Sequence, residues 1–141
     1  MRVEQDADHD GVGAGMPRTI FGTDGDDRID GSDVRDVIVA AGGDDVIDAG
    51  RGLDLVCAGL GNDSVHGGAG ADEIRGDAGA DIIDAQGGKD FVHGGPGTDL
   101  LNGGLGRDRV WGGAGTDECW GERLRCEIAH RTRHDEVAGP S

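Results

Sequence analysis

Aspartate is the residue whose spacing in this sequence most clearly suggests chemistry. When residues 22–120 are divided into segments of nine, position six of all eleven segments is aspartate, and no insertion or deletion interrupts the frame. These residues are Asp27, Asp36, Asp45, Asp54, Asp63, Asp72, Asp81, Asp90, Asp99, Asp108 and Asp117. Carboxylate oxygens are the ligands that hard cations such as calcium prefer in proteins. A regular column of carboxylates therefore predicts a series of cation sites.

Two further columns indicate the elements that would position the aspartates. Position four is glycine in ten of the eleven copies, and position eight is isoleucine, valine or leucine in ten. Glycine permits a sharp turn with positive φ, and an apolar residue between two variable ones is typical of the inward position of a strand. Each copy therefore predicts a six-residue turn and a three-residue strand, so that two copies close one coil of 18 residues.

Stacked coils would bring together the aspartates of every second copy. Parallel strands lie about 4.8 Å apart, and two carboxylates at that distance repel by about 1 kcal/mol in water and about 3 kcal/mol at a dielectric constant near 20. The eleven aspartates form two such rows with nine adjacent pairs. A divalent cation between consecutive loops would convert this repulsion into attraction. Calcium suits the position because it takes roughly six to eight oxygen ligands in flexible geometry. We therefore predict up to about nine calcium ions (Ca2+).

The composition restricts the remaining functional classes. The chain has 141 residues, of which 30 are glycine, a net charge of −16, two Phe, two Trp and no Tyr. Such an acidic chain lacks the basic surface that nucleic acids and anionic membranes require, and no apolar run approaches the roughly 20 residues that cross a bilayer. So little apolar material predicts disorder unless a ligand contributes to folding. We expect a monomer with no nucleic-acid partner and no membrane insertion.

Zinc binding and catalysis fit the pattern less well than calcium binding. His66 and His93 lie three copies apart, without the close spacing of zinc ligands. Every repeated aspartate is accounted for by the loops, and no nucleophile–base arrangement remains. We therefore expect no enzymatic activity.

Several copies match one known nonapeptide in full. Residues 67–75 (GGAGADEIR), 94–102 (GGPGTDLLN) and 103–111 (GGLGRDRVW) carry the pattern G-G-x-G-x-D-x-U-x, where U is a large apolar residue. The array resembles the hemolysin-type calcium-binding repeat of the repeats-in-toxin (RTX) family. This resemblance implies an all-β fold, a right-handed parallel β-roll (a calcium-stabilised β-solenoid) with short irregular termini. It also implies calcium held between loops, folding coupled to calcium, and the eleven aspartates as side-chain ligands.

The array divides the chain into three parts. We expect an acidic lead-in at residues 1–21, the β-roll at 22–120, and a degenerate capping segment and tail at 121–141. Within the roll, Val34 replaces the turn glycine, which puts the site shared by Asp36 and Asp54 in doubt. Residues 6–11 (DADHDG) match the first half of an EF-hand loop, but Pro17 stands where the bidentate glutamate belongs. An acidic lead-in is therefore favoured over a weak calcium site there.

Cysteines and targeting signals bear on the compartment. Cys119 and Cys126 lie seven residues apart at the end of the array. A disulfide closing the last coil is the preferred interpretation, and two reduced thiols in a cytosolic protein are the alternative. Cys57 would then be an unpaired surface thiol. Residues 1–19 lack the apolar middle region of a secretory signal, so we expect processing, a fragment or another export route.

The sequence favours a secreted, extracellular calcium-binding repeat protein in which calcium drives folding. The alternative is an adhesive or accessory module, or a fragment, of a secreted enzyme or toxin, with a protein or surface polysaccharide as its partner.

Overall fold

The fold consists of strands and turns alone in the part of the chain that is described. A computed structural model describes residues 2–4, 18–121 and 123–128, and it describes side chains for residues 18–121. The EF-hand-like segment 6–11, Pro17 and the end of the tail lie outside the described residues. The predicted all-β class is confirmed, because every element of the described ranges is a β-strand.

Fourteen strands form two seven-stranded sheets, each containing every second strand. The odd sheet contains, in spatial order, β1 (Arg2–Glu4), β3 (Arg28–Ser32), β5 (Val46–Gly50), β7 (Ser64–His66), β9 (Ile82–Asp84), β11 (Leu100–Asn102) and β13 (Glu118–Trp120). The even sheet contains β2 (Arg18–Phe21), β4 (Asp36–Val39), β6 (Leu55–Cys57), β8 (Glu73–Arg75), β10 (Phe91–His93), β12 (Arg107–Gly113) and β14 (Arg123–Ile128).

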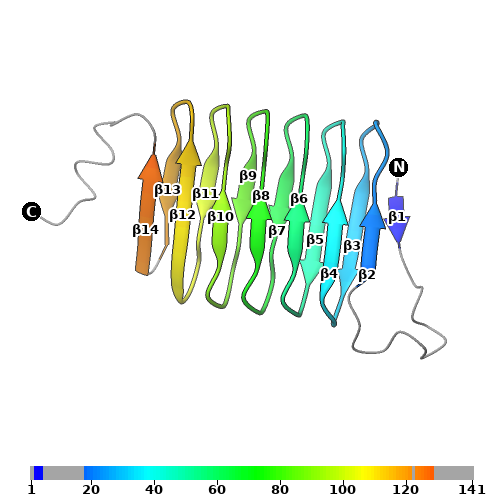
Figure 1. The fold of residues 1–141 in the computed structure, drawn as a ribbon, viewed down its shortest axis with the longest axis horizontal. Helices are drawn as coiled ribbons and strands as arrows, with labels where there is room; N and C mark the ends of the chain where they lie inside the picture. The colour runs from blue at the N-terminus through cyan, green and yellow to red at the C-terminus, as the bar shows by residue number, and fades with distance from the viewer. Residues whose placement is uncertain (1, 5–17, 122, 129–141) are drawn as a thin grey trace, which may run out of the picture.

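All strand pairs are parallel, and the register confirms a coil of 18 residues. Val65 of β7, for example, lies between Ile47 of β5 and Ile83 of β9. Figure 1 shows the two sheets lying back to back with opposite strand directions, joined by short loops along two edges. The loops of odd-numbered copies follow one edge (the odd edge) and those of even-numbered copies follow the other (the even edge). The chain is therefore a parallel β-roll of flattened coils.

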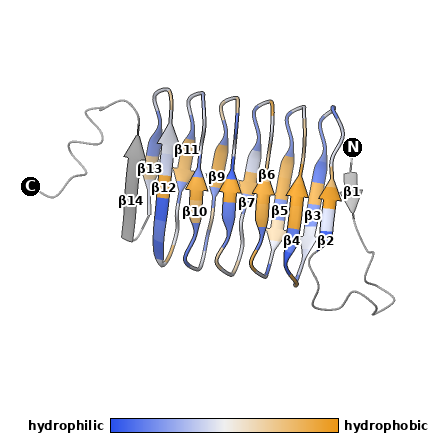
Figure 2. Ribbon diagram, viewed as in Figure 1, coloured by the Kyte–Doolittle hydropathy of each residue, from blue (hydrophilic) through white to orange (hydrophobic). Residues whose placement is uncertain are grey.

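The core is a single layer between the sheets, as the apolar column at position eight predicts. The position-eight residues from Ile29 to Val110 are at most 1% exposed, and Cys119 packs against the end of this layer. Strands such as β4, β6, β8 and β10 carry strongly hydrophobic residues, whereas much of the loop ribbon is polar or neutral (Figure 2). Four alanines, Ala40, Ala49, Ala58 and Ala85, add only methyl groups to this layer. Because each strand supplies only one large inward apolar side chain, each coil contributes little apolar area.

The turns take their shape from two positions with positive φ. In copies three to eleven, positions two and four both lie in this region, including the non-glycine residues Ala41, Asp77 and Gln86 at position two. A Cβ added at Gly70, position four of copy six, would collide with the carbonyl oxygen of Gly52 in the neighbouring coil. Glycine at position four is thus required both by φ and by the close stacking of turns.

Candidate calcium-binding loops

The structure brings the eleven predicted aspartates into two buried rows. Each is at most 3% exposed, although each carries a carboxylate. The row along the odd edge, the odd ladder, contains Asp27, Asp45, Asp63, Asp81, Asp99 and Asp117. The row along the even edge, the even ladder, contains Asp36, Asp54, Asp72, Asp90 and Asp108. Burial of this many acidic side chains is costly unless they are paired or bind a cation.

From Asp45 onward, one oxygen of each carboxylate is held by the neighbouring coil. The backbone N–H of the aspartate 18 residues earlier donates to Oδ1, as in Asp63 to Asp81 and Asp72 to Asp90. All nine adjacent pairs have this bond, at 2.7–2.9 Å. The sequence predicted that these aspartates would be neighbours, but it did not predict that they hydrogen-bond to one another through the backbone.

The second oxygen has different surroundings. Seven Oδ2 atoms are buried without a hydrogen-bond partner among the described residues, namely those of Asp45, Asp54, Asp63, Asp72, Asp81, Asp90 and Asp99. In copy six, Oδ2 of Asp72 lies 2.9 Å from where a Cβ on Gly67 would stand. Position one is only ever glycine or alanine, so no side chain larger than a methyl group stands beside this oxygen. A buried carboxylate oxygen without a hydrogen bond is available as a ligand for a cation.

Burial makes the ionised carboxylate unfavourable in these loops. Desolvation is the largest cause, and it raises the pKa although the hydrogen bond from the preceding aspartate N–H lowers it. The pKa values are raised to about 6 for Asp45 and Asp72, about 7 for Asp54, Asp63 and Asp99, and about 8 for Asp81 and Asp90. A cation at the loops would favour the ionised form and so reverse this effect.

A second row of side chains shows that hydrogen bonding alone does not require aspartate. At the exposed position five of the odd edge, Oδ1 of Asp26 accepts from the Asp44 N–H at 2.7 Å and Oδ1 of Asp44 from the Asn62 N–H at 2.8 Å. Asn62 continues the row by accepting from the Ala80 N–H at 2.8 Å. An amide therefore serves in such a row as well as a carboxylate. The hydrogen bond alone therefore does not explain why position six is aspartate in every copy.

The first two loops differ from the other nine. In copies one and two, Thr23 and Ser32 occupy position two, and Gly25 and Val34 occupy position four. None of these four residues has positive φ. The Thr23 N–H donates to Oδ2 of Asp27 at 2.5 Å, and the Ser32 N–H donates to Oδ2 of Asp36 at 2.7 Å. The Thr23 N–H bond, the largest cause, lowers the pKa of Asp27. Val34 is accommodated because its turn does not need a left-handed residue.

Sequence reasoning missed Arg18. β2 extends the even sheet one strand before the first copy, and Arg18 of β2 pairs in register with Asp36 of β4. Arg18 Nε lies 3.8 Å from Asp36 Oδ1, an ion-pair distance, and the two side chains are 9% and 0% exposed. The sequence feature that could have revealed Arg18 is Ile20, which stands nine residues before Ile29 and continues the apolar column. In that frame Arg18 occupies position six.

The donor set fits calcium better than a transition metal. Across residues 18–121, no three His, Cys, Asp or Glu side chains come together as a metal-binding group. Side chains alone would therefore not complete a calcium coordination shell, and backbone carbonyls of the glycine turns are the further oxygen donors at hand. An all-oxygen set with flexible geometry suits calcium, whereas zinc favours His and Cys and magnesium needs a tight octahedron.

Cys119 is disulfide-bonded, and Cys57 on β6 is free and partly exposed. The side chain of Cys126, the partner expected from the sequence, lies outside the described residues. The described residues include no helix that is long and apolar enough to cross a membrane.

A family model for the RTX calcium-binding nonapeptide repeat matches the chain in four copies, at residues 21–56, 30–65, 58–92 and 93–123. No curated protein matches the chain.

Proposed function

Because this chain belongs to the family of RTX calcium-binding nonapeptide repeats, we propose that calcium ions bound along both ladders drive the folding of the β-roll. The observation that carries this proposal is the set of seven buried Oδ2 atoms without a hydrogen bond among the described residues. Each belongs to a carboxylate that burial makes costly in its ionised form. The proposed ligands are these carboxylates together with carbonyl oxygens of the glycine turns.

Calcium binding at these loops is coupled to folding by electrostatics. The coils stack their carboxylates without enough apolar core to offset the repulsion, because each strand contributes only one large inward apolar residue. When bound, calcium supplies the positive charge that neutralises adjacent carboxylates. The chain's own residues then hold the geometry, since from Asp45 onward Oδ1 is fixed by a backbone N–H of the previous coil, as in Asp81 and Asp90. Removing calcium should therefore unfold coils as well as empty sites.

We propose an extracellular, non-catalytic role. Calcium sites of flexible extracellular modules work at dissociation constants of about 10⁻⁴–10⁻³ M, which would keep such a roll folded outside cells. The disulfide at Cys119 also supports an oxidising compartment, because disulfides are rare in the cytosol.

A calcium titration followed by far-UV circular dichroism tests the proposal. We expect little strand signal in excess chelator and a cooperative gain of strand signal as calcium is added, with magnesium at the same concentration giving much less. Full strand signal in chelator, unchanged by calcium, would contradict calcium-driven folding.

A further inference from the structure

The two N-terminal loops carry the same internal network, which no other described loop shares. Thr23 Oγ1 lies 2.8 Å from Asp27 Oδ1, and Ser32 Oγ lies 3.2 Å from Asp36 Oδ1. The same hydroxyls accept the N–H groups of Gly25 and Val34, each at 3.2 Å. Together with the N–H bonds from position two, this network closes each loop around its own carboxylate.

This network depends on the backbone of the first two loops. From copy three onward, position two has positive φ, and seven of the Oδ2 atoms have no hydrogen-bond partner among the described residues. In copies one and two, position two lies outside that region, and its N–H donates to Oδ2. The backbone conformation at positions two and four thus separates loops whose Oδ2 is bound by the protein from loops whose Oδ2 is left for a cation.

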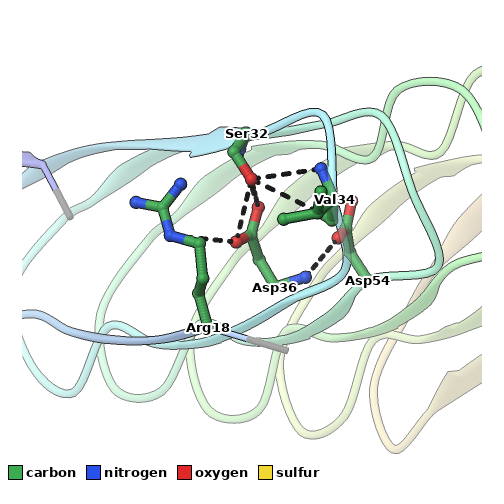
Figure 3. Close-up of polar contacts among 5 residues, drawn as sticks. All are labelled: Arg18, Ser32, Val34, Asp36 and Asp54. Carbon is green, nitrogen blue, oxygen red and sulfur yellow. Dashed lines mark hydrogen bonds and ion pairs between the residues drawn. The ribbon is translucent and has the colours of Figure 1, made fainter. Parts of the chain in front are cut away.

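Arg18 adds a charge to the second of these loops. Figure 3 shows its side chain reaching Asp36 from one side while Ser32 approaches from the other. In the next coil of the even ladder, Asp36 has Asp54 as its neighbour, and Oδ1 of Asp54 accepts the Asp36 N–H at 2.7 Å. In the preceding coil, the residue in register with Asp36 is Arg18. A guanidinium therefore stands where the ladder would otherwise continue with a carboxylate.

We infer that copies one and two, with Arg18, form a metal-independent cap that closes the N-terminal end of both ladders, and that calcium binding begins at copy three. This inference rests on the proposed function. Asp27 and Asp36 then stabilise the end of the roll through hydrogen bonds and an ion pair rather than as calcium ligands. Of the nine adjacent carboxylate pairs, Asp27–Asp45 and Asp36–Asp54 no longer count, which lowers the maximum number of inter-loop ions to seven.

Counting bound calcium tests which aspartates are ligands. Bound ions are measured by equilibrium dialysis at a free calcium concentration that just saturates the parent chain. The test pair is Asp27→Asn and Asp36→Asn, and the matched pair on the same two ladders is Asp63→Asn and Asp72→Asn. We expect the first pair to bind as many ions as the parent and the second pair to bind at least one fewer.

The outcomes separate the inference from the proposed function. Loss of ions in Asp27→Asn or Asp36→Asn equal to the loss in Asp63→Asn or Asp72→Asn would overturn the cap while leaving calcium binding intact. A parent chain that binds no calcium would overturn the proposed function and the cap together. An ion count is used only for a variant whose circular dichroism spectrum in calcium matches that of the parent. If Asp27→Asn does not fold, Thr23→Val, which removes one hydroxyl, replaces it.

A second measurement tests the counter-charge role of Arg18. In saturating calcium, Arg18→Gln should lower the melting midpoint by about 5 °C or more, because it leaves a buried carboxylate without its cation. Arg28→Gln is the control, because Arg28 forms a weak, solvent-exposed ion pair. Its side chain is 59% exposed, and its Nε lies 4.0 Å from Oδ1 of the partly exposed Asp30. Adding Asp36→Asn to Arg18→Gln should restore most of the loss. No restoration in the double variant would mean that Arg18 acts by packing alone, and would overturn its place in the cap.

Discussion

A position-six aspartate has two oxygens with separate roles. In copy seven, Oδ1 of Asp81 accepts the Asp63 N–H at 2.9 Å, which ties one coil to the next. Oδ2 of the same residue is buried and has no hydrogen bond among the described groups. The first contact would survive replacement by asparagine, as Asn62 shows at position five. The second needs the negative charge if it binds calcium, so the two roles can be separated by one substitution.

Asp81→Asn should keep the coil stacking and weaken calcium binding. We expect the calcium concentration at the folding midpoint to rise severalfold, up to about tenfold for a loss near 1.4 kcal/mol. Asp84→Asn is the control, because Asp84 lies three residues later on β9 with its side chain partly exposed. Circular dichroism during calcium titration gives both midpoints. Equal midpoints for the two variants would count against Asp81 as a ligand.

At the scale of the element, the turn rather than the strand limits which residues are accepted. Strand positions seven and nine hold residues as different as Glu73, Phe91 and Arg109, with the last two in a cation–π contact at 5.7 Å. Position four of the turn, by contrast, combines positive φ with contact to the carbonyl of the neighbouring coil. Turn geometry therefore carries more of the fold's specificity than strand composition does.

Two glycine-to-alanine substitutions in neighbouring turns should have opposite effects. Gly70→Ala places a Cβ at φ +120° and against the Gly52 carbonyl, so we expect a loss of about 1–3 kcal/mol in stability. A Cβ on Gly87, at position three, would meet no atom within 4 Å, and Gly87 pairs with Ala69 and Leu105, which already carry Cβ atoms. Gly87→Ala should be neutral or stabilise by up to about 1 kcal/mol. Thermal unfolding in saturating calcium measures both, and similar losses would refute the assignment of strain to position four.

At the scale of the whole molecule, each coil packs only on the coils before and after it. Such solenoids are stabilised by the sum of neighbour contacts, and the outermost coils lack one neighbour. β2 and Arg18 support the N-terminal end, whereas β14 and the disulfide at Cys119 support the C-terminal end. The two ends are thus closed by different chemistry.

Reduction should loosen the C-terminal end. In saturating calcium, a reductant is expected to destabilise the chain by about 2–4 kcal/mol, the usual contribution of a disulfide in a small protein. Hydrogen exchange should rise first in β13 and the adjacent part of β11. Cys57→Ser is the control, because Cys57 is free and lies on β6 far from that end. Uniform loss of protection along the array would argue against an end-specific role.

The period of the sequence predicted the fold because one rule is repeated in each copy. Aspartate, glycine and an apolar residue in fixed frame were sufficient to predict the coil of 18 residues, the two sheets and the buried column. The cap was not predicted, because it lies where the frame weakens. Thr23 and Ser32 replace glycine, and β2 has Arg18 at the aspartate position. The backbone bond to Oδ1 was also unpredictable, since side-chain spacing does not reveal which backbone N–H a carboxylate faces.

The 18-residue register has a mechanical consequence. A stretch of 18 extended residues spans roughly 60 Å, at about 3.3–3.6 Å per residue, whereas one closed coil advances the rod by only about 4.8 Å. Closing a coil therefore shortens the chain more than tenfold along the rod axis. If calcium drives that closure, a change in calcium concentration changes the length of the chain along the rod axis as well as its fold.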